Sequence, residues 1–394
     1  MTLTECNAAQ CTGYGFVAYN GSCMKLKSCM AQQCRLSGVH VVGSRGSAEN
    51  CSITDAKQYD MFAADMGSIE ARNCTVTRSG LSGFQARGSA ALLKATGCEV
   101  DACNKHGFSA HSGGRMVLKQ CQATAPGHAG FQASGKGTCL IVTDSTADRS
   151  RGAGFHAVDK AHIEMLRCNA NLSHCSGLCA GSASKARAWD CTFCRNLQHG
   201  MIAASRASMI ALRCTVQHNG DSGFRAVHPG TLFTLTDSAC DGGRVGCSAY
   251  HQAQLVVYRL IVRGSTDAGF AVYRAGSITL QDCKSEKQRA AAPQSLDSTW
   301  SELSEEGHMY PRYDAVAKLP VSNTTFRDGR VWVHKQQAVK AGGDKGYTAV
   351  NDADYQKIWG LVRYCNSYSD ASFLGKNPAR MVLRSSAKNV RDYE

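Results

Sequence analysis

Five side chains that can bind a ligand recur at related places in the sequence: Gln85, Arg87, His111, Gln132 and His156. Each follows a glycine by two or four residues, which places all five on one side of a strand that begins after that glycine. Arginine, glutamine and histidine donate hydrogen bonds to carboxylates and hydroxyl groups. The spacing predicts a polar patch that binds an anionic or hydroxyl-rich ligand. The alternative is that these outward side chains are only solvated.

Three tyrosines are expected on the same face, toward its ends: Tyr19, Tyr250 and Tyr273. They would either extend the patch or serve as ordinary strand residues, since tyrosine is common in strands.

The 21 cysteines are the second set of chemically capable residues. The group most suggestive of a metal site is Cys191-x-x-Cys194, with His174, Cys175 and Cys179 nearby. A structural zinc site usually needs two cysteine pairs that converge on one ion, and Cys191 already belongs to a regularly spaced column. We therefore predict that the cysteines pack as small apolar residues in a ladder. No metal, cofactor or catalytic residue is assigned.

That column lies fourteen residues after a recurring glycine and contains Cys29, Cys74, Cys121, Cys168, Cys191, Cys214 and Cys283. Asp144 and Asp237 are predicted to replace the cysteine in two copies, which suits a position near a bend.

The glycines mark an internal repeat of 22 to 24 residues, most often 23. In each copy an apolar residue follows the glycine and a small or apolar residue stands two places further on. A degenerate copy at Asp60-Met61 completes a set of twelve. The others begin at Gly15, Gly38, Gly83, Gly107, Gly130, Gly154, Gly177, Gly200, Gly223, Gly246 and Gly269.

Each copy predicts three short strands separated by bends, because apolar residues alternate after the glycine, after a Gly-Ser-like turn and after the cysteine. A unit of 23 residues cannot bury an apolar face alone, but stacked units form three parallel sheets around a continuous core. We predict an all-β fold, a right-handed parallel β-helix of about twelve coils. A leucine-rich repeat is rejected because no Leu-x-x-Leu-x-Leu run recurs.

The Gly-Phe-x-Ala and x-Cys-x-Val ladders of residues 6 to 283 resemble the parallel β-helix repeat superfamily. That superfamily includes pectate lyases, alginate epimerases and the β-helix domains of eukaryotic F-box and SHC-binding proteins, to which this chain is closest in character. The ladders specify the fold strongly and the function hardly at all.

For lyases of this fold, the resemblance implies calcium held by clustered aspartates beside a catalytic arginine or lysine, and for hydrolases it implies grouped carboxylates. The outward positions of the first strand carry no carboxylate here, and the acidic residues elsewhere do not repeat in register. A lyase or glycosidase is therefore disfavoured. An epimerase that uses tyrosine, histidine and arginine remains the best enzymatic alternative.

The repeat stops near residue 283, and the composition changes. Residues 284–394 hold one cysteine, four of the six prolines and three of the four tryptophans. We expect a strand within Phe326 to Val339 and a helix capped by Asp352 that runs through Tyr364. The exposed end of a β-helix needs a cover. We therefore predict that residues 1–283 form the β-helix and residues 284–394 a mixed capping or partner-binding region.

Lysine and arginine total 44 against 31 acidic residues, a formal excess of 13 positive charges that favours acidic partners. Nucleic acid is disfavoured because aromatics that would stack bases are not interleaved with the basic residues. No apolar run approaches the length of a membrane span. The cysteines and the polar start of the chain predict reduced thiols, hence a cytoplasmic or other reducing intracellular compartment.

These observations favour a non-catalytic β-helix scaffold that mediates protein-protein interaction within a larger assembly. The alternative is a β-helix that binds carbohydrate, with an anionic glycan as ligand, or that processes polyuronate as an epimerase or lyase.

Overall fold

The computed structural model describes residues 1–286 and seven short strands between Glu302 and Arg384. The chain divides into two compact units, Met1–Ile202 with Ala207–Ile210 and Ala203–Arg206 with Ala211–Glu394. The fold is the predicted all-β solenoid of about twelve turns of about 23 residues. Within the described residues, no helix is long and apolar enough to cross a membrane.

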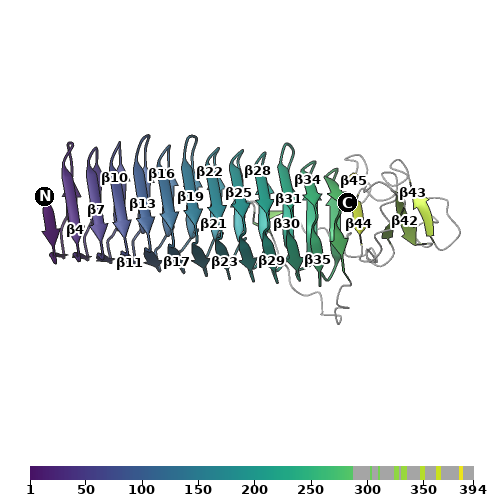
Figure 1. Cartoon of the computed structure of the whole chain (residues 1–394), viewed down its shortest axis with the longest axis horizontal. Coiled ribbons are helices and arrows are strands. Elements are labelled where there is room, and N and C mark those ends of the chain that lie inside the picture. The colour runs from purple at the N-terminus through teal and green to yellow at the C-terminus, as the bar shows by residue number, and fades with distance from the viewer. Residues whose placement is uncertain are drawn as a thin grey trace. The chain divides into compact units, whose positions relative to one another are not determined.

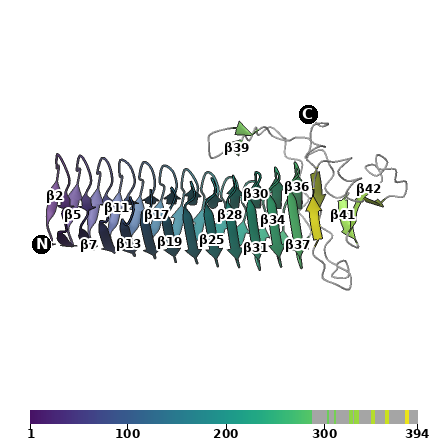
Figure 2. The same ribbon diagram turned by 90° about the horizontal axis from the view of Figure 1, so that it is seen from above.

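Unit 1 contains three parallel sheets, called sheets A, B and C (Figures 1 and 2). Sheet A consists of β1 (Thr2–Thr4), β4 (Cys23–Lys27), β7 (Arg45–Glu49), β10 (Ser68–Arg72), β13 (Leu92–Thr96), β16 (Arg115–Lys119), β19 (Cys139–Thr143), β22 (His162–Leu166) and β25 (Lys185–Trp189). Sheet B consists of β2 (Asn7–Ala9), β5 (Met30–Gln32), β8 (Ser52–Thr54), β11 (Thr75–Thr77), β14 (Glu99–Asp101), β17 (Gln122–Thr124), β20 (Thr146–Asp148), β23 (Asn169–Asn171) and β26 (Thr192–Cys194). Sheet C consists of β3 (Phe16–Ala18), β6 (Val39–Val42), β9 (Met61–Ala64), β12 (Phe84–Arg87), β15 (Phe108–His111), β18 (Phe131–Ser134), β21 (Phe155–Val158) and β24 (Leu178–Ala180).

Strands β27 (Met201–Ala204) and β28 (Ser208–Leu212) contain residues of both units. Unit 2 repeats the three-sheet pattern. Its parallel strands are β31 (Leu232–Thr236), β34 (Gln254–Tyr258) and β37 (Ser277–Gln281) in sheet A, β29 (Thr215–Gln217), β32 (Ala239–Asp241), β35 (Ile261–Arg263) and β38 (Lys284–Ser285) in sheet B, and β30 (Ser222–Val227), β33 (Val245–Tyr250) and β36 (Ala268–Tyr273) in sheet C.

Parallel pairing continues through β38, so it ends at Ser285, slightly beyond the predicted boundary at residue 283. Strands β44 (Leu361–Tyr364) and β45 (Met381–Arg384) then pair antiparallel with β36 and β37. The remaining strands are β39 (Glu302–Leu303), β40 (Met309–Tyr310), β41 (Thr324–Arg327), β42 (Arg330–His334) and β43 (Tyr347–Val350).

The predicted helix through Tyr364 is wrong at its end, because Leu361–Tyr364 form strand β44. The unpaired edge of β36 offers hydrogen-bonding groups to this segment, and a strand satisfies them whereas a helix does not. The expected cap at Asp352 and the rest of that helix lie outside the described residues. Within Phe326 to Val339, the predicted strand is found as the end of β41 and as β42.

A phenylalanine column fills the core of unit 1. The rings of Phe84, Phe108, Phe131 and Phe155 are fully buried and stack with centroid separations of 4.9, 5.0 and 4.7 Å. Register explains the stack, because each phenylalanine is the first residue of its sheet C strand and pairs with the next. The phenylalanines of the Gly-Phe-x-Ala ladder thus form one buried column over these four coils. Phe224, which also follows a repeat glycine, is buried within unit 2.

The cysteine ladder lies inside the bend between sheets A and B. Cys121 is representative, since its Sγ donates to the carbonyl oxygens of Lys119 at 3.4 Å and Ala95 at 3.6 Å. The prediction that Asp144 and Asp237 replace cysteine is wrong by one residue. Ser145 and Ser238 are the inward residues, and their hydroxyls accept backbone N–H bonds from Cys121 and Cys214.

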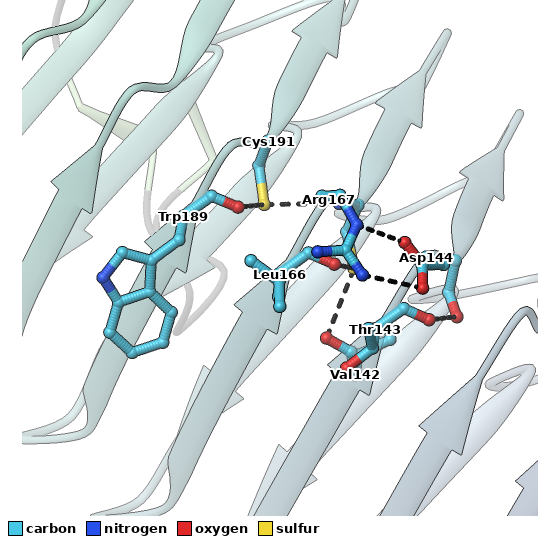
Figure 3. Close-up of polar contacts among 9 residues, drawn as sticks. Val142, Thr143, Asp144, Leu166, Arg167, Trp189 and Cys191 are labelled. Atoms are coloured by element: carbon cyan, nitrogen blue, oxygen red, sulfur yellow. Dashed lines mark hydrogen bonds and ion pairs between the residues drawn. The ribbon is translucent and has the colours of Figure 1, made fainter.

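Asp144 instead occupies the bend itself, with a φ of 51°. This left-handed conformation is unfavourable for most side chains but tolerated by aspartate and asparagine. Arg167 occupies the same position in the next coil. Its Nε and Nη2 atoms donate hydrogen bonds to Asp144 Oδ1 and Oδ2 at 2.6 and 3.0 Å (Figure 3). Asp237 and Arg259 repeat this pair in unit 2. Each such exposed ion pair contributes little to the stability of the fold. The pairs link the bends of successive coils through their side chains.

Asp60 occupies the position that glycine holds in the other copies. Its side chain is fully buried, and neither carboxyl oxygen makes a hydrogen bond of normal geometry within the described residues. Burial raises the pKa of Asp60 well above its ordinary value, and the Ala56 backbone N–H offsets only part of that effect. Burial therefore favours the neutral form of this carboxyl in the folded state.

Truncation of the central phenylalanine tests the core. Phe131→Ala is expected to lower the free energy of unfolding by about 3 to 5 kcal/mol, because it leaves a cavity between two stacked rings. Urea denaturation followed by circular dichroism measures the change. A loss below about 1 kcal/mol would contradict the buried column, since it is typical of exposed sites.

The buried carboxyl predicts an unusual pH dependence. Below about pH 4, the pKa of an aspartate in the unfolded chain, Asp60 is protonated in both the folded and the unfolded state. The gain in the free energy of unfolding from Asp60→Asn should therefore be smallest there. As pH rises, only the unfolded state releases the proton, and wild-type stability should fall relative to Asp60→Asn.

Asp144→Asn serves as the matched control for this measurement. Because Arg167 lowers the pKa of Asp144, its carboxylate stabilises the fold above about pH 4, and that contribution disappears as pH falls. The two variants should therefore show opposite slopes when denaturation is followed from pH 3 to pH 8. Equal slopes would show that Asp60 is not buried as a neutral acid.

Candidate ligand-binding face

The five predicted binding residues come together on the outer face of sheet C in unit 1. Strand register places Gln85, Gln132 and His156 in one outward column, with Ser109 between the two glutamines. Arg87 and His111 are paired in a second column, two residues further along the strands. The polar patch expected from the spacing is thus a real juxtaposition across β12, β15, β18 and β21.

The patch differs from expectation at Gln85. Its side chain is only 6% exposed, and its Oε1 atom is buried and unpaired within the described residues. Arg87 is exposed, whereas His111 and Gln132 are partly exposed. Ser109 donates from its hydroxyl to Gln132 Oε1 at 3.3 Å, which orients that amide. Arg87, His111 and Gln132 are therefore accessible to a ligand, but Gln85 is not.

Two histidines in the turn before sheet C join the patch. The His106 ring lies 5.4 Å from the His128 ring, and its Nδ1 accepts the Ala129 backbone N–H at 3.2 Å. Burial, together with the neighbouring His128 and His156, lowers the pKa of His106 to about 3. His106 is consequently neutral and carries its proton on Nε2. In the sequence, His106 can be recognised as part of this face because it directly precedes the repeat glycine Gly107.

An aromatic cluster adjoins the polar patch on β6 and β9, in the turns on either side of β3 and in the turn before β9. It consists of Tyr14, Tyr19, His40, Tyr59 and Phe62. His40 lies 4.2 Å from Tyr14 and 4.9 Å from Phe62, and Tyr59 stacks on Phe62 at 4.9 Å, between ring centroids. Tyr19 contacts Tyr14 and His40 edge-on and is 41% exposed.

The aromatic cluster and the polar patch share one column. His40 pairs with Phe62 in the register of sheet C, and Phe62 pairs with Gln85. The outward position predicted for Tyr19 is confirmed. Tyr14, Tyr59 and Phe62 escaped sequence analysis because two lie in turns and the third belongs to the degenerate copy.

The other two tyrosines expected on this face belong to unit 2. Tyr250 and Tyr273 stack there with a centroid separation of 4.2 Å, and the Arg225 guanidinium lies 4.1 Å from the centre of the Tyr250 ring. Tyr273 is only 4% exposed. These tyrosines therefore form a separate cluster within unit 2.

The Cys191-x-x-Cys194 pair is divided between two environments. Cys191 lies buried in the ladder, where its Sγ donates to the Trp189 carbonyl at 3.2 Å, as Figure 3 shows. Cys194 is a partly exposed outward residue of β26. In the described part of the chain, no group of three potential ligands is arranged for a metal ion, and the cysteines are free thiols. The predicted reducing compartment stays a prediction.

Comparison with known proteins agrees with this architecture. A family model described as "Right handed beta helix region" matches residues 1–147. The matched residues belong to the parallel sheets described above, and parallel pairing of the same kind continues to Ser285. No curated protein matches the sequence.

Solved structures share the fold of this β-helix at low identity. The catalytic domain of a GH87 α-1,3-glucanase in complex with tetrasaccharides is 11% identical, with a TM-score of 0.52 over 74% of this chain. The match spans 64% of the length of that domain. The A-module of mannuronan C-5 epimerase AlgE4 from Azotobacter vinelandii is 15% identical, with a TM-score of 0.47 over 71% of this chain and 91% of that one. At this identity, the likeness concerns the fold alone.

The protonation of His106 can be tested directly. Its ring resonances should not titrate between about pH 5 and pH 8, a range in which an ordinary histidine changes charge. Nuclear magnetic resonance of the histidine side chains, with His106→Gln for assignment, measures this. A midpoint near pH 6.5 for His106 would mean that its ring is solvated rather than buried in the patch.

Proposed function

We propose that the outer face of sheet C in unit 1 binds an acidic oligosaccharide. The observation that carries the proposal is the shared column, which runs from the aromatic cluster through the buried Gln85 and Ser109 to the partly exposed Gln132 and His156 on the same face. This reverses the order of the hypotheses drawn from sequence, in which a protein-interaction scaffold came first. The aromatic cluster supports glycan binding over the scaffold hypothesis, because aromatic rings offer apolar surface to a sugar. The repeat pattern did not reveal this cluster.

Sugar rings present apolar faces and hydroxyl edges, and this surface offers partners for both. The exposed ring of Tyr19 provides an apolar surface with a polar tip. Gln132 and His111 provide hydrogen-bonding groups that suit hydroxyls. Sheet C contributes seven neighbouring strands from β3 to β21, and at ~4.8 Å per strand the face is ~29 Å long. An oligomer fits this length better than a single sugar.

Preference for an acidic sugar follows from charge. Arg87 is exposed and makes no ion pair within residues 1–286. Lys105 and His128 are exposed in the turns before β15 and β18. A guanidinium can bind a carboxylate through two parallel hydrogen bonds, which adds both energy and specificity. A uronate oligomer would supply one such carboxylate per ring.

The shared fold supports carbohydrate binding by analogy only. The α-1,3-glucanase with the same fold was solved with bound tetrasaccharides, and one fold commonly hosts several functions. The side chains of this chain must therefore carry the proposal. Those on the face supply stacking and hydrogen bonds, so the proposed activity is binding.

Calorimetric titration with a uronate oligomer and a neutral oligomer of equal length tests the proposal. The double variant Arg87→Ala, His111→Ala should weaken uronate binding at least about tenfold, since charge-assisted hydrogen bonds are lost. The salt dependence of binding should fall as well. Tyr19→Ala should weaken both oligomers by similar factors.

Arg45→Ala is the matched control, because Arg45 is an exposed arginine on sheet A and should leave binding unchanged. The proposal fails if wild-type protein binds neither oligomer, or if Arg45→Ala weakens binding as much as the double variant does. Release of unsaturated ends or altered uronate stereochemistry would replace binding with turnover as the function.

A further inference from the structure

A cluster of reactive side chains lies on sheet A of unit 1, apart from the proposed glycan face. Cys139 begins β19 and pairs in register with His162, the first residue of β22. On its other side, Cys139 pairs with Arg115 of β16. Both neighbours stand on the same outward face as the thiol. Neighbouring parallel strands are ~4.8 Å apart, so these side chains are adjacent.

A carboxylate orients the imidazole of His162. Its Nε2 lies 2.9 Å from Glu164 Oε1, and Arg187 donates to the same oxygen at 3.2 Å. His162 also lowers the pKa of Glu164, which keeps that carboxyl ionised. Because the carboxylate can only accept, Nε2 carries the proton and Nδ1 of the neutral ring is an acceptor. Nδ1 is buried and has no hydrogen-bond partner within the described residues.

The thiol beside this base rests in its protonated form. Burial raises the pKa of Cys139, Glu164 raises it as well, and Arg115 acts in the opposite direction. A base must therefore remove the proton before the sulfur can attack, since the thiolate is the nucleophile. A nucleophile, a base and a group that orients the base are the three parts of an activated thiol site.

We propose that Cys139 is a nucleophilic thiol that exchanges with small disulfides bearing carboxylates, with His162 as its base and Glu164 as the residue that positions that base. His162 Nδ1 accepts the thiol proton, and the Cys139 sulfur attacks one sulfur of the incoming disulfide. The bond between the two incoming sulfurs breaks, and the departing thiolate takes the proton from His162. A mixed disulfide on Cys139 and one free thiol result, and the incoming disulfide is the oxidant.

Charge selects the kind of disulfide. Arg115 is exposed beside Cys139 and makes no ion pair within residues 1–286, and Lys185 is exposed beyond His162. Arg187 is already engaged by Glu164. Incoming carboxylates would therefore meet Arg115 and Lys185 on opposite sides of the reacting pair.

Site-resolved mass spectrometry with oxidised glutathione tests the proposal on the full chain. Cys23 is an internal control, because it begins β4 on the same sheet, is exposed and pairs in register with Arg45, but has no histidine beside it. Although Cys23 is the more exposed thiol, Cys139 should form the mixed disulfide at least about tenfold faster, as general-base assistance commonly provides. A rate at Cys139 equal to or below that of Cys23 would overturn the proposal.

Three variants separate the roles. His162→Gln should slow Cys139 about tenfold and remove the pH dependence of its rate near neutrality, while Cys23 is unchanged. Glu164→Gln should slow Cys139 less. Arg115→Ala should slow reaction with oxidised glutathione but not with cystamine, a cationic disulfide. Unchanged rates in His162→Gln refute the base, and equal slowing of both disulfides in Arg115→Ala refutes the selection by charge. Circular dichroism checks that each variant is folded.

Discussion

Parallel, in-register pairing of successive coils is the constraint on which the structure of unit 1 depends. A three-residue strand such as β11 has no stability alone, but the coils before and after complete its backbone hydrogen bonds. This pairing requires equivalent residues to stack directly above one another. Every inward position must therefore accept its own neighbour as a packing partner, which is why Phe108 meets Phe131 at 5.0 Å and small residues fill the crowded bends.

The same constraint organises the outer faces. Because register aligns outward residues into columns, a functional surface arises from side chains that are about one repeat apart in sequence. The aromatic cluster and the polar patch of sheet C are consecutive stretches of such columns. The Cys139, His162 and Glu164 group on sheet A arises in the same way. The parallel sheets thus position both groups of side chains, and turn residues such as Tyr14 and His106 add to the group on sheet C.

At a few positions, a charged or polar residue replaces the usual residue of the repeat, and the fold accommodates it. Asp60 puts a carboxyl where the copy needs a glycine, and the fold accommodates it as a buried neutral acid. At the bend between sheets A and B, one left-handed residue precedes each inward residue. Asp144 and Arg167 fill that outer position while Ser145 and Cys168 fill the inner one. Charge and polarity are therefore tolerated at the outer position of the bend, because the residue that follows it is the one buried in the core.

Much of this architecture was determined by the sequence itself, because a repeated glycine, aromatic and cysteine pattern is compatible with few folds. The spacing also placed Arg87, His111, Gln132 and His156 on one face, since strand alternation is a local property. Only the tertiary structure decided that Gln85 is buried, that the turn residues Tyr14 and Tyr59 join the face, and that Leu361–Tyr364 form a strand. Burial, turn geometry and edge pairing depend on contacts between distant residues, and no local pattern records them.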